Sequence, residues 1–248
     1  MSEAEPVVVL TGASSGIGHA LAIRLAASHT VIAVARRQGA LEQLATGQPG
    51  IEPCIADVAD PADRARIAAA VGNRRVGYLI HNAGTLEPVG PLLEQSTDAI
   101  RQSLAVNVEA PIALSQALFD HMATGARILH ISSGAAHRAL AGWGAYCTSK
   151  AALYMVYEVL KAELSNRGVV IGSLRPGVVD TPMQALIRQQ TSEDFPAVDQ
   201  FRAMKANHQL TTPHDCARFI AAVLLETDAA PFTEREWDIR EDWHSVCD

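Results

Sequence analysis

The chain has 248 residues, 48% of them hydrophobic and 19% charged, and its net charge at pH 7 is −7. This length is compatible with one α/β domain, since such folds run to about 250 residues as one unit. No apolar run approaches the roughly 20 residues that span a bilayer, so a membrane protein is not expected. The basic residues form no stripe, which argues against a nucleic-acid-binding surface.

Cysteine usage and the start of the chain bear on where the protein works. Cys54, Cys147, Cys216 and Cys247 lie far apart without a C-x-x-C pair, so neither a disulfide framework nor a metal site is expected. The acidic start leads directly into an apolar strand-like run and lacks the regions of a secretory signal. We therefore expect a cytoplasmic protein with reduced thiols.

Short β-branched runs alternate with longer segments of helical period, which predicts parallel strands joined by helical crossovers. Nearly continuous apolar strands indicate a sheet that is covered on both faces. The fold class expected for residues 1–248 is therefore α/β, a single-domain doubly wound parallel sheet of about seven strands. Strands are predicted at residues 7–11, 31–35, 51–56, 76–81, 126–131, 169–175 and 237–240, and helices around 16–28, 38–46, 61–71, 97–122, 145–166 and 213–225.

A glycine-rich turn, T-G-A-S-S-G-I-G, follows the first strand and opens the first helix. Gly12 permits a tight turn, Gly16 lets the backbone approach a pyrophosphate, and Gly18 allows close packing of helix on strand. The helix N-terminus adds a partial positive charge. Ser14 and Ser15 supply either hydroxyl contacts to a ligand or local turn and capping hydrogen bonds. The context favours the dinucleotide site of a Rossmann-type fold over a loop with packing glycines.

The end of the second strand bears on the choice of nucleotide. NAD-binding domains place an acidic residue there for the ribose 2′-hydroxyl, but this chain has Ala35 followed by Arg36 and Arg37. A planar guanidinium at Arg36 suits a 2′-phosphate, and no carboxylate repels that phosphate. Arg37 either belongs to the same site or is solvated. The sequence thus predicts NADP(H) in preference to NAD(H).

Polar residues also follow the third and fourth strands. Asp57 and Val58 come after the third, and Asn82, Ala83 and Gly84 come after the fourth. Both positions lie at the carboxyl edge of the sheet, where open α/β folds bind ligands. Asp57 either holds the adenine amino group or acts as an acid near the start of the next helix.

Tyr146 and Lys150 lie four residues apart at the start of a predicted helix, so they share one of its faces. A phenol has an ordinary pKa near 10, and a neighbouring ammonium lowers that pKa. Tyr146 is then able to donate a proton to a carbonyl oxygen while hydride arrives from a nicotinamide. Taken alone, the same spacing also suits a surface tyrosine beside a solvated lysine.

Two further positions support a reacting centre. Ser132 and Ser133 end the fifth strand, where a hydroxyl can hold the substrate oxygen and its developing charge. Asn107 interrupts an apolar helical stretch. Its amide either ties water into a proton relay to Lys150 or is a satisfied core group.

Together these motifs resemble the short-chain dehydrogenase/reductase family, in its single-domain branch, over nearly the whole chain. The resemblance includes a variant of N-N-A-G with His81 in place of the first asparagine, and Pro176-Gly177 followed by Thr181. In the family, the catalytic serine stands at a fixed spacing before the tyrosine. Ser133, rather than Ser132, has that spacing to Tyr146. The resemblance thus implies that the catalytic residues are Asn107, Ser133, Tyr146 and Lys150, and that the cofactor contacts come from Gly12, Ser14, Ser15, Gly16, Ile17, Gly18, Arg36, Arg37, Asp57, Val58, Asn82, Ala83, Gly84, Tyr146, Lys150, Pro176, Val179 and Thr181.

Within the family, the segments Tyr146 to Lys150, Val179 to Gln184, Ile187-Arg188 and Glu193 to Pro196 are similar to the sepiapterin reductase and benzil reductase group. This resemblance implies reduction of one carbonyl of a vicinal diketone or a related α-dicarbonyl. Residues 183–210 are polar and irregular, and are expected to form a lid over the substrate. Ser133, Trp143 and Met183 are the predicted substrate contacts. Trp143 and Met183, with Leu186 and Phe195, form either an apolar substrate wall or plain packing.

The predicted function is therefore an NADPH-dependent carbonyl reductase that acts on a ketone or a vicinal diketone. A 3-oxoacyl or hydroxysteroid-type oxidoreductase, or a non-catalytic NADP-binding protein, is the alternative. The resemblance also implies a homodimer or homotetramer formed through helices 97–122 and 145–166. Partners other than a small-molecule substrate, such as nucleic acid or a membrane, are not expected.

Overall fold

The structure, a computed structural model, describes residues 5–247. The expected acidic start of the chain falls mostly on residues 1–4, which lie outside the described residues. Parallel strands form one sheet in the order β3-β2-β1-β4-β5-β6-β7, which confirms the expected α/β class. The strands are β1 (Val7–Thr11), β2 (Val31–Ala35), β3 (Ile51–Ile55), β4 (Val76–His81), β5 (Met122–Ile131), β6 (Val169–Arg175) and β7 (Glu236–Asp238).

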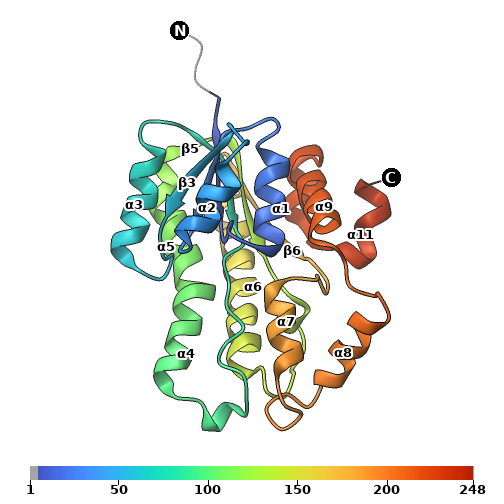
Figure 1. Ribbon diagram of the computed structural model, residues 1–248. Helices are drawn as coiled ribbons and strands as arrows, with labels where there is room; N and C mark the ends of the chain where they lie inside the picture. Colours follow the sequence, from blue (N-terminus) through green and yellow to red (C-terminus); the bar gives the residue numbers. More distant parts are fainter. Residues whose placement is uncertain (1–4, 248) are drawn as a thin grey trace.

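Helices cover both faces of this sheet (Figure 1), and every residue of β1 and β2 is buried. The covering follows from the apolar strands, which have no polar face to offer to water. One face packs against α1 (Gly16–Leu25), α2 (Gln38–Ala45), α9 (Pro213–Glu226), α10 (Ala229–Glu234) and α11 (Ile239–Val246). The other face packs against α3 (Pro61–Val71), α5 (Ala110–Leu118) and α6 (Gly144–Leu164).

The strand order reverses at β1, which pairs in parallel with β2 on one side and with β4 on the other. The crossovers from β1 to β3 therefore run over one face and those from β3 to β6 over the other, which leaves a crevice at the carboxyl ends of β1 and β4, where such folds bind ligands. Beyond this edge lie α4 (Thr97–Leu104), α7 (Pro182–Gln189) and α8 (Val198–Ala206), in the lower half of Figure 1.

The expected continuous helix over residues 97–122 is wrong. The segment divides into α4, a π-helical stretch (Ala105–Glu109), α5 and a short 3₁₀ turn (Phe119–His121). Pro111 gives a physical reason for the irregularity, because it has no N–H to bond the carbonyl four residues earlier, which belongs to Asn107. The following strand also begins earlier than predicted, at Met122 rather than at residue 126.

The C-terminal part differs from expectation as well. The strand predicted at residues 237–240 ends at Asp238, since the Asp238 side chain accepts a hydrogen bond from the backbone N–H of Arg240 at 2.9 Å and caps α11. Neither α10 nor α11 was predicted. The expected lid over residues 183–210 contains α7, which begins at Pro182, and α8. Between residues 5 and 247, none of the helices is both long enough and apolar enough to cross a membrane.

Candidate functional site

A cavity of about 500 Å³ opens at the carboxyl edge of the sheet, where the strand order reverses. Almost every residue predicted to contact a dinucleotide lines it; Val179 does not, and lines the neighbouring cavity instead. The predicted residues along its wall are Gly12, Ser14, Ser15, Gly16, Ile17, Gly18, Arg36, Arg37, Asp57, Val58, Asn82, Ala83, Gly84, Tyr146, Lys150, Pro176 and Thr181.

The glycine turn leaves no room for side chains. Gly12 and Gly16 have φ angles of +72° and +55°, which disfavour any residue with a Cβ. A Cβ built on Gly18 would stand 2.3 Å from the carbonyl oxygen of Gly12, and one on Gly12 would stand 2.8 Å from the Cα of Ala83. The turn is thus a cradle of exposed backbone at the N-terminus of α1, and its shape and dipole suit a phosphate group.

Both arginines after β2 line this cavity, but they are held differently. Arg37 is not simply solvated, because its guanidinium donates to the Oγ and the carbonyl oxygen of Ser14 at 3.1 Å each. Arg36 is largely exposed, and its Nη1 lies 3.7 Å from a carboxylate oxygen of Asp57. Ser15 starts α1 without a side-chain capping bond, so its hydroxyl is available to a ligand.

Asp57 is not the acid that caps the next helix. That position belongs to Asp60, whose side chain accepts from the backbone N–H of Ala62 and of Asp63. Asp57 instead lies on the cavity wall beside Arg36. The role of the acid at the start of this helix, which was one of the two alternatives for Asp57, therefore belongs to Asp60.

Asn82 braces the glycine turn against β4. Its Nδ2 donates to the carbonyl oxygen of Thr11 at 2.9 Å, and its backbone N–H donates to the Thr11 hydroxyl at 3.1 Å. His81, immediately before it, points away from this turn into the core, where its Nε2 lies 2.9 Å from the Oγ of Ser115. The substitution of histidine for the family's asparagine thus leaves the contacts of Asn82 in place.

Tyr146 lies on the walls of two cavities, the large one and a neighbouring one of about 140 Å³. The Ser133 hydroxyl is its hydrogen-bond partner. Ser133 follows β5, and its Oγ also accepts from the backbone N–H of Ala135 at 3.1 Å, which fixes the side chain. Lys150 lies one turn further along α6, with its Nζ 5.9 Å from the centre of the Tyr146 ring and 2.8 Å from the carbonyl oxygen of Ile131.

Burial governs the ionisation of both groups on α6. It raises the pKa of Tyr146, and the hydrogen bond from Ser133 opposes that rise only in part. The net direction is therefore opposite to the lowering by Lys150 that the sequence predicted. Burial also lowers the pKa of Lys150 to about 8, while Glu236 acts in the opposite direction. Tyr146 is consequently a neutral phenol at pH 7, the form that donates a proton.

Asn107 lies behind these residues and lines neither cavity. It is only 1% exposed, and the π-helical stretch positions it between two elements. Its Oδ1 accepts from the backbone N–H of Thr85, and its Nδ2 donates to the Thr85 carbonyl and to Ser149 Oγ, all at 2.9 Å. Its side chain is therefore fully bonded, as in the core-group alternative, and ties the loop after β4 to α6.

The smaller cavity lies beside Ser133 and Tyr146 and is closed by α7 and α8. The predicted substrate residues Trp143 and Met183 line it, but Leu186 and Phe195 do not. Phe195 instead packs behind the wall, where its ring stacks on Trp143 at 4.6 Å with an interplanar angle of 6°. The wall also includes residues that were not predicted, among them Leu86, Arg138, Gln184, Ile187 and Phe201.

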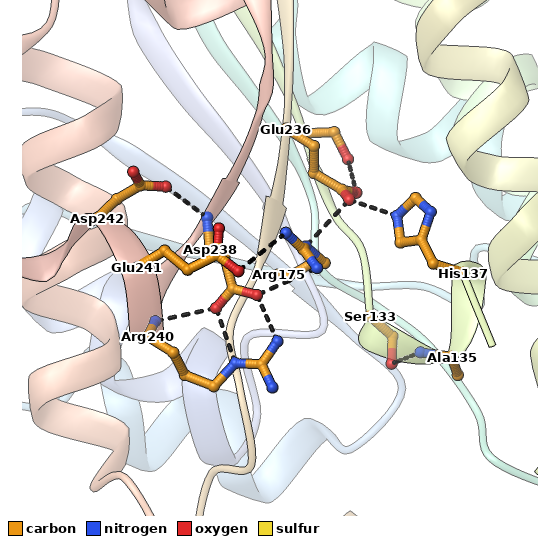
Figure 2. A network of polar contacts seen from close by, with 10 residues as sticks. Ser133, Ala135, His137, Arg175, Glu236, Asp238, Arg240, Glu241 and Asp242 are labelled. Atoms are coloured by element: carbon orange, nitrogen blue, oxygen red, sulfur yellow. Dashed lines mark hydrogen bonds and ion pairs between the residues drawn. The ribbon is translucent and has the colours of Figure 1, made fainter.

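Figure 2 shows a network of charged residues from β6 and the C-terminal segment. Two of them, Arg175 and Arg240, line the smaller cavity. Arg175 lies between the carboxylates of Glu236 and Asp238, with an N–O distance of 3.2 Å to each. Glu236 also lies 2.6 Å from the Nε2 of His137, and Asp238 is paired with Arg240. These pairs join β7 to β6 and to the loop after Ser133, which positions the cavity wall.

A model of the family described as short chain dehydrogenase matches residues 6–192. The chain is a short-chain dehydrogenase/reductase. It is 34% identical over 239 residues to a benzil reductase ((S)-benzoin forming) of Bacillus cereus, covering 90% of this chain and 95% of the relative. It is 36% identical over 180 residues to the L-xylulose reductase of Mesocricetus auratus, covering 71% and 72% of the two chains.

The solved structures agree with this assignment. A short-chain dehydrogenase from Burkholderia cenocepacia J2315, in complex with NADP, superposes with a TM-score of 0.79 at 30% identity. The alignment covers 94% of this chain and 95% of the other. As a short-chain dehydrogenase/reductase, the protein is an oxidoreductase, and its two adjoining cavities match the need of such an enzyme to bring two reactants together.

Proposed function

We propose that the protein is an NADPH-dependent carbonyl reductase that transfers hydride to a ketone or a vicinal diketone, with Tyr146 as the general acid. The observation that carries the proposal is that Tyr146 lies on the walls of both cavities at their junction. A proton donor at that point reaches a carbonyl oxygen in the small cavity while a hydride donor occupies the large one.

The residues of the large cavity fit a dinucleotide phosphate. The glycine cradle, which a Cβ would fill, suits the pyrophosphate, and Arg36 and Arg37 stand where the second strand ends. When bound, NADPH supplies the hydride. Arg36 and the Arg37–Ser14 pair would hold the 2′-phosphate through guanidinium hydrogen bonds. The NADP complex of the Burkholderia relative supports this preference.

Proton transfer is the task of three side chains. Tyr146 donates its phenolic proton to the substrate oxygen as negative charge develops there. Because burial raises the pKa of Tyr146, the phenol keeps this proton before the reaction. The Ser133 Oγ accepts from Ala135 N–H, and the Ser133 proton, which faces the Tyr146 oxygen, would turn to the substrate oxygen and stabilise its charge. The Lys150 ammonium donates one of its three N–H groups to the carbonyl oxygen of Ile131. The other two can donate to the cofactor and to the phenolate that forms.

The relatives support a carbonyl as the substrate, because the matched curated proteins are reductases of a diketone and of a ketose. Residues 183–210 act in this proposal as the substrate lid, through the wall that α7 and α8 give to the smaller cavity. Val179 and Trp143 contact the substrate side of the site, and Asn107 acts by positioning α6.

Replacing Tyr146 with phenylalanine tests the proposal. The variant keeps the ring but loses the proton donor, so kcat should fall by about 10² to 10⁴. NADPH binding, followed by cofactor fluorescence, should stay within about twofold of that of the unchanged protein. The measurement is the oxidation of NADPH, read at its absorbance band, with a panel of ketones and vicinal diketones. Full activity in Tyr146→Phe would contradict the assigned mechanism.

A further inference from the structure

The smaller cavity contains an amide donor that no group among residues 5–247 accepts from. Gln184 lies in the first turn of α7, is 2% exposed and lines this cavity. Its Oε1 accepts a hydrogen bond from Arg188, one turn later on the same helix. Within the described residues its Nε2 is buried without any hydrogen-bond partner. The oxygen of this amide therefore has a hydrogen-bond partner, and its nitrogen has none among the described residues.

The orientation of this amide is fixed by its neighbour. A guanidinium has only donors, so the Gln184 oxygen, and not its nitrogen, must face Arg188. Arg188 is itself held, with its Nη1 3.8 Å from a carboxylate oxygen of Asp180. A rotated amide would bring two donors together. The Nε2 group is thus the one that remains for an occupant of the cavity.

Gln184 is not alone in this state. Trp143 also lines the cavity, and among residues 5–247 its indole Nε1 has no hydrogen-bond partner either. The cavity wall contains apolar side chains, among them Leu86, Ile187 and Phe201, and its charged side chains are arginines, which offer donors and no acceptors. Buried donors without partners are rare in folded proteins because they forfeit their hydrogen bonds to water. A bound molecule that carries an acceptor recovers what is lost.

The reacting carbonyl oxygen is not the acceptor for these two donors, because it already accepts hydrogen bonds from Ser133 and Tyr146. The acceptor for the free donors must be a second oxygen. The cavity volume of about 140 Å³ is well below the roughly 300 Å³ at which ordinary ligand pockets begin, so the occupant is short. In a short molecule the second oxygen has to stand close to the first.

Resting on the proposed carbonyl reduction, we propose that Gln184 Nε2 donates a hydrogen bond to a second substrate oxygen, on the carbon next to the reacting carbonyl. This contact selects short-chain vicinal diketones and α-hydroxyketones over carbonyl compounds with one oxygen. Gln184 is then a specificity-determining residue. The oxygen of a simple aldehyde or ketone meets Tyr146 and Ser133 equally well, but leaves this donor unsatisfied.

The test compares Gln184→Met with the unchanged protein on two substrates of equal carbon number, 2,3-pentanedione and pentanal. Methionine keeps the length of the side chain and removes the donor. The expected result is a fall of about tenfold in kcat/KM for the diketone, and a change below about twofold for pentanal. Comparing each substrate with itself across the variants cancels their different intrinsic reactivities.

Gln189→Met is the matched control, because Gln189 is exposed at the end of the same helix. It should leave both kcat/KM values unchanged. Gln184→Glu keeps the shape, offers only acceptors, and should lose at least as much on the diketone as Gln184→Met. Thermal unfolding and NADPH binding of each variant show that the fold and the larger cavity are intact.

The outcomes separate the two proposals. Equal losses on pentanal and 2,3-pentanedione, or an unchanged kcat/KM for the diketone in Gln184→Met, would overturn the role of Gln184 and leave the carbonyl reductase standing. Failure of the unchanged protein to reduce any ketone, aldehyde or diketone with NADPH would overturn the proposed function and the substrate preference with it.

Discussion

Two histidines lie buried behind the reacting centre without taking part in it. His81 and His130, on adjacent strands, have ring centres 5.2 Å apart, and neither is more than 3% exposed. Burial lowers the pKa of both, and the charge of Lys150 lowers that of His130 further, to about 3. Both rings are therefore neutral in the folded protein at pH 7, and their protonation requires that the core be opened.

This pair predicts acid sensitivity. Unfolded histidine has a pKa near 6.5, so between that pH and 3 the unfolded chain binds a proton at residue 130 that the folded chain does not. The stability that His130 contributes is complete above pH 6.5 and declines as the pH falls, with a slope of up to about 1.4 kcal/mol per pH unit. Urea unfolding at intervals from pH 7.5 to pH 5 measures it.

His130→Phe supplies the control, because phenylalanine preserves a ring beside His81 and cannot titrate. Its free energy of unfolding should depend less steeply on pH than that of the unchanged protein. Identical slopes for the two proteins would mean that His130 takes up its proton equally in the folded and the unfolded states, which would contradict the lowered pKa.

At the scale of elements, the sequence predicted best what is local to the chain. Ser133, Tyr146 and Lys150 follow from positions at a strand end and on one helix face, and the structure brings them together. Gln184 and Phe201 were missed because their place on the cavity wall depends on how α7 and α8 fold back onto the sheet edge. Neither helix was predicted separately within residues 183–210. The π-helical stretch Ala105–Glu109 was not predicted, because the apolar period continues through it and only Pro111, one turn after Asn107, interrupts the helical hydrogen bonds.

The position of α8 leads to a prediction about substrate size. Phe201 lines the smaller cavity and also packs against Trp143, with ring centres 5.3 Å apart. Phe201→Val enlarges the cavity and should raise kcat/KM for benzil by about fivefold or more relative to that for 2,3-pentanedione. Steady-state kinetics with both diketones measure the ratio.

Phe195→Leu is the comparison for this change. Phe195 supports Trp143 from outside the cavity, so that variant should not raise the ratio. A fall in the benzil rate with Phe201→Val would instead identify the Phe201 ring as a stacking partner of an aromatic substrate.

At the scale of the whole molecule, the two cavities depend on different parts of the chain. The larger cavity is built mainly from the first four strands, whose order and crossovers the sequence pattern predicted. The smaller one needs the lid helices and the C-terminal charge network, in which Arg175 joins β6 to Glu236 and Asp238 of β7. That network links residues about 60 positions apart, a pairing that no local pattern encodes.

Because the larger cavity is part of the folded chain only, a nucleotide that binds there stabilises the whole molecule by mass action. NADPH at about 100 times its dissociation constant should add about 2.7 kcal/mol, which for a chain of this size raises Tm by roughly 5 to 10 °C. NADH at the same concentration should raise Tm less, because it lacks the 2′-phosphate that the guanidinium of Arg36 would bind. In Arg36→Ala, the Tm shifts with NADPH and with NADH should become nearly equal. Arg101→Ala is the control, because it removes an exposed arginine paired with Asp98 on α4, and it should preserve the difference between the two Tm shifts. Scanning fluorimetry of the three proteins with each nucleotide measures these shifts, and an equal shift with NADH and NADPH in the unchanged protein would contradict the assigned cofactor preference.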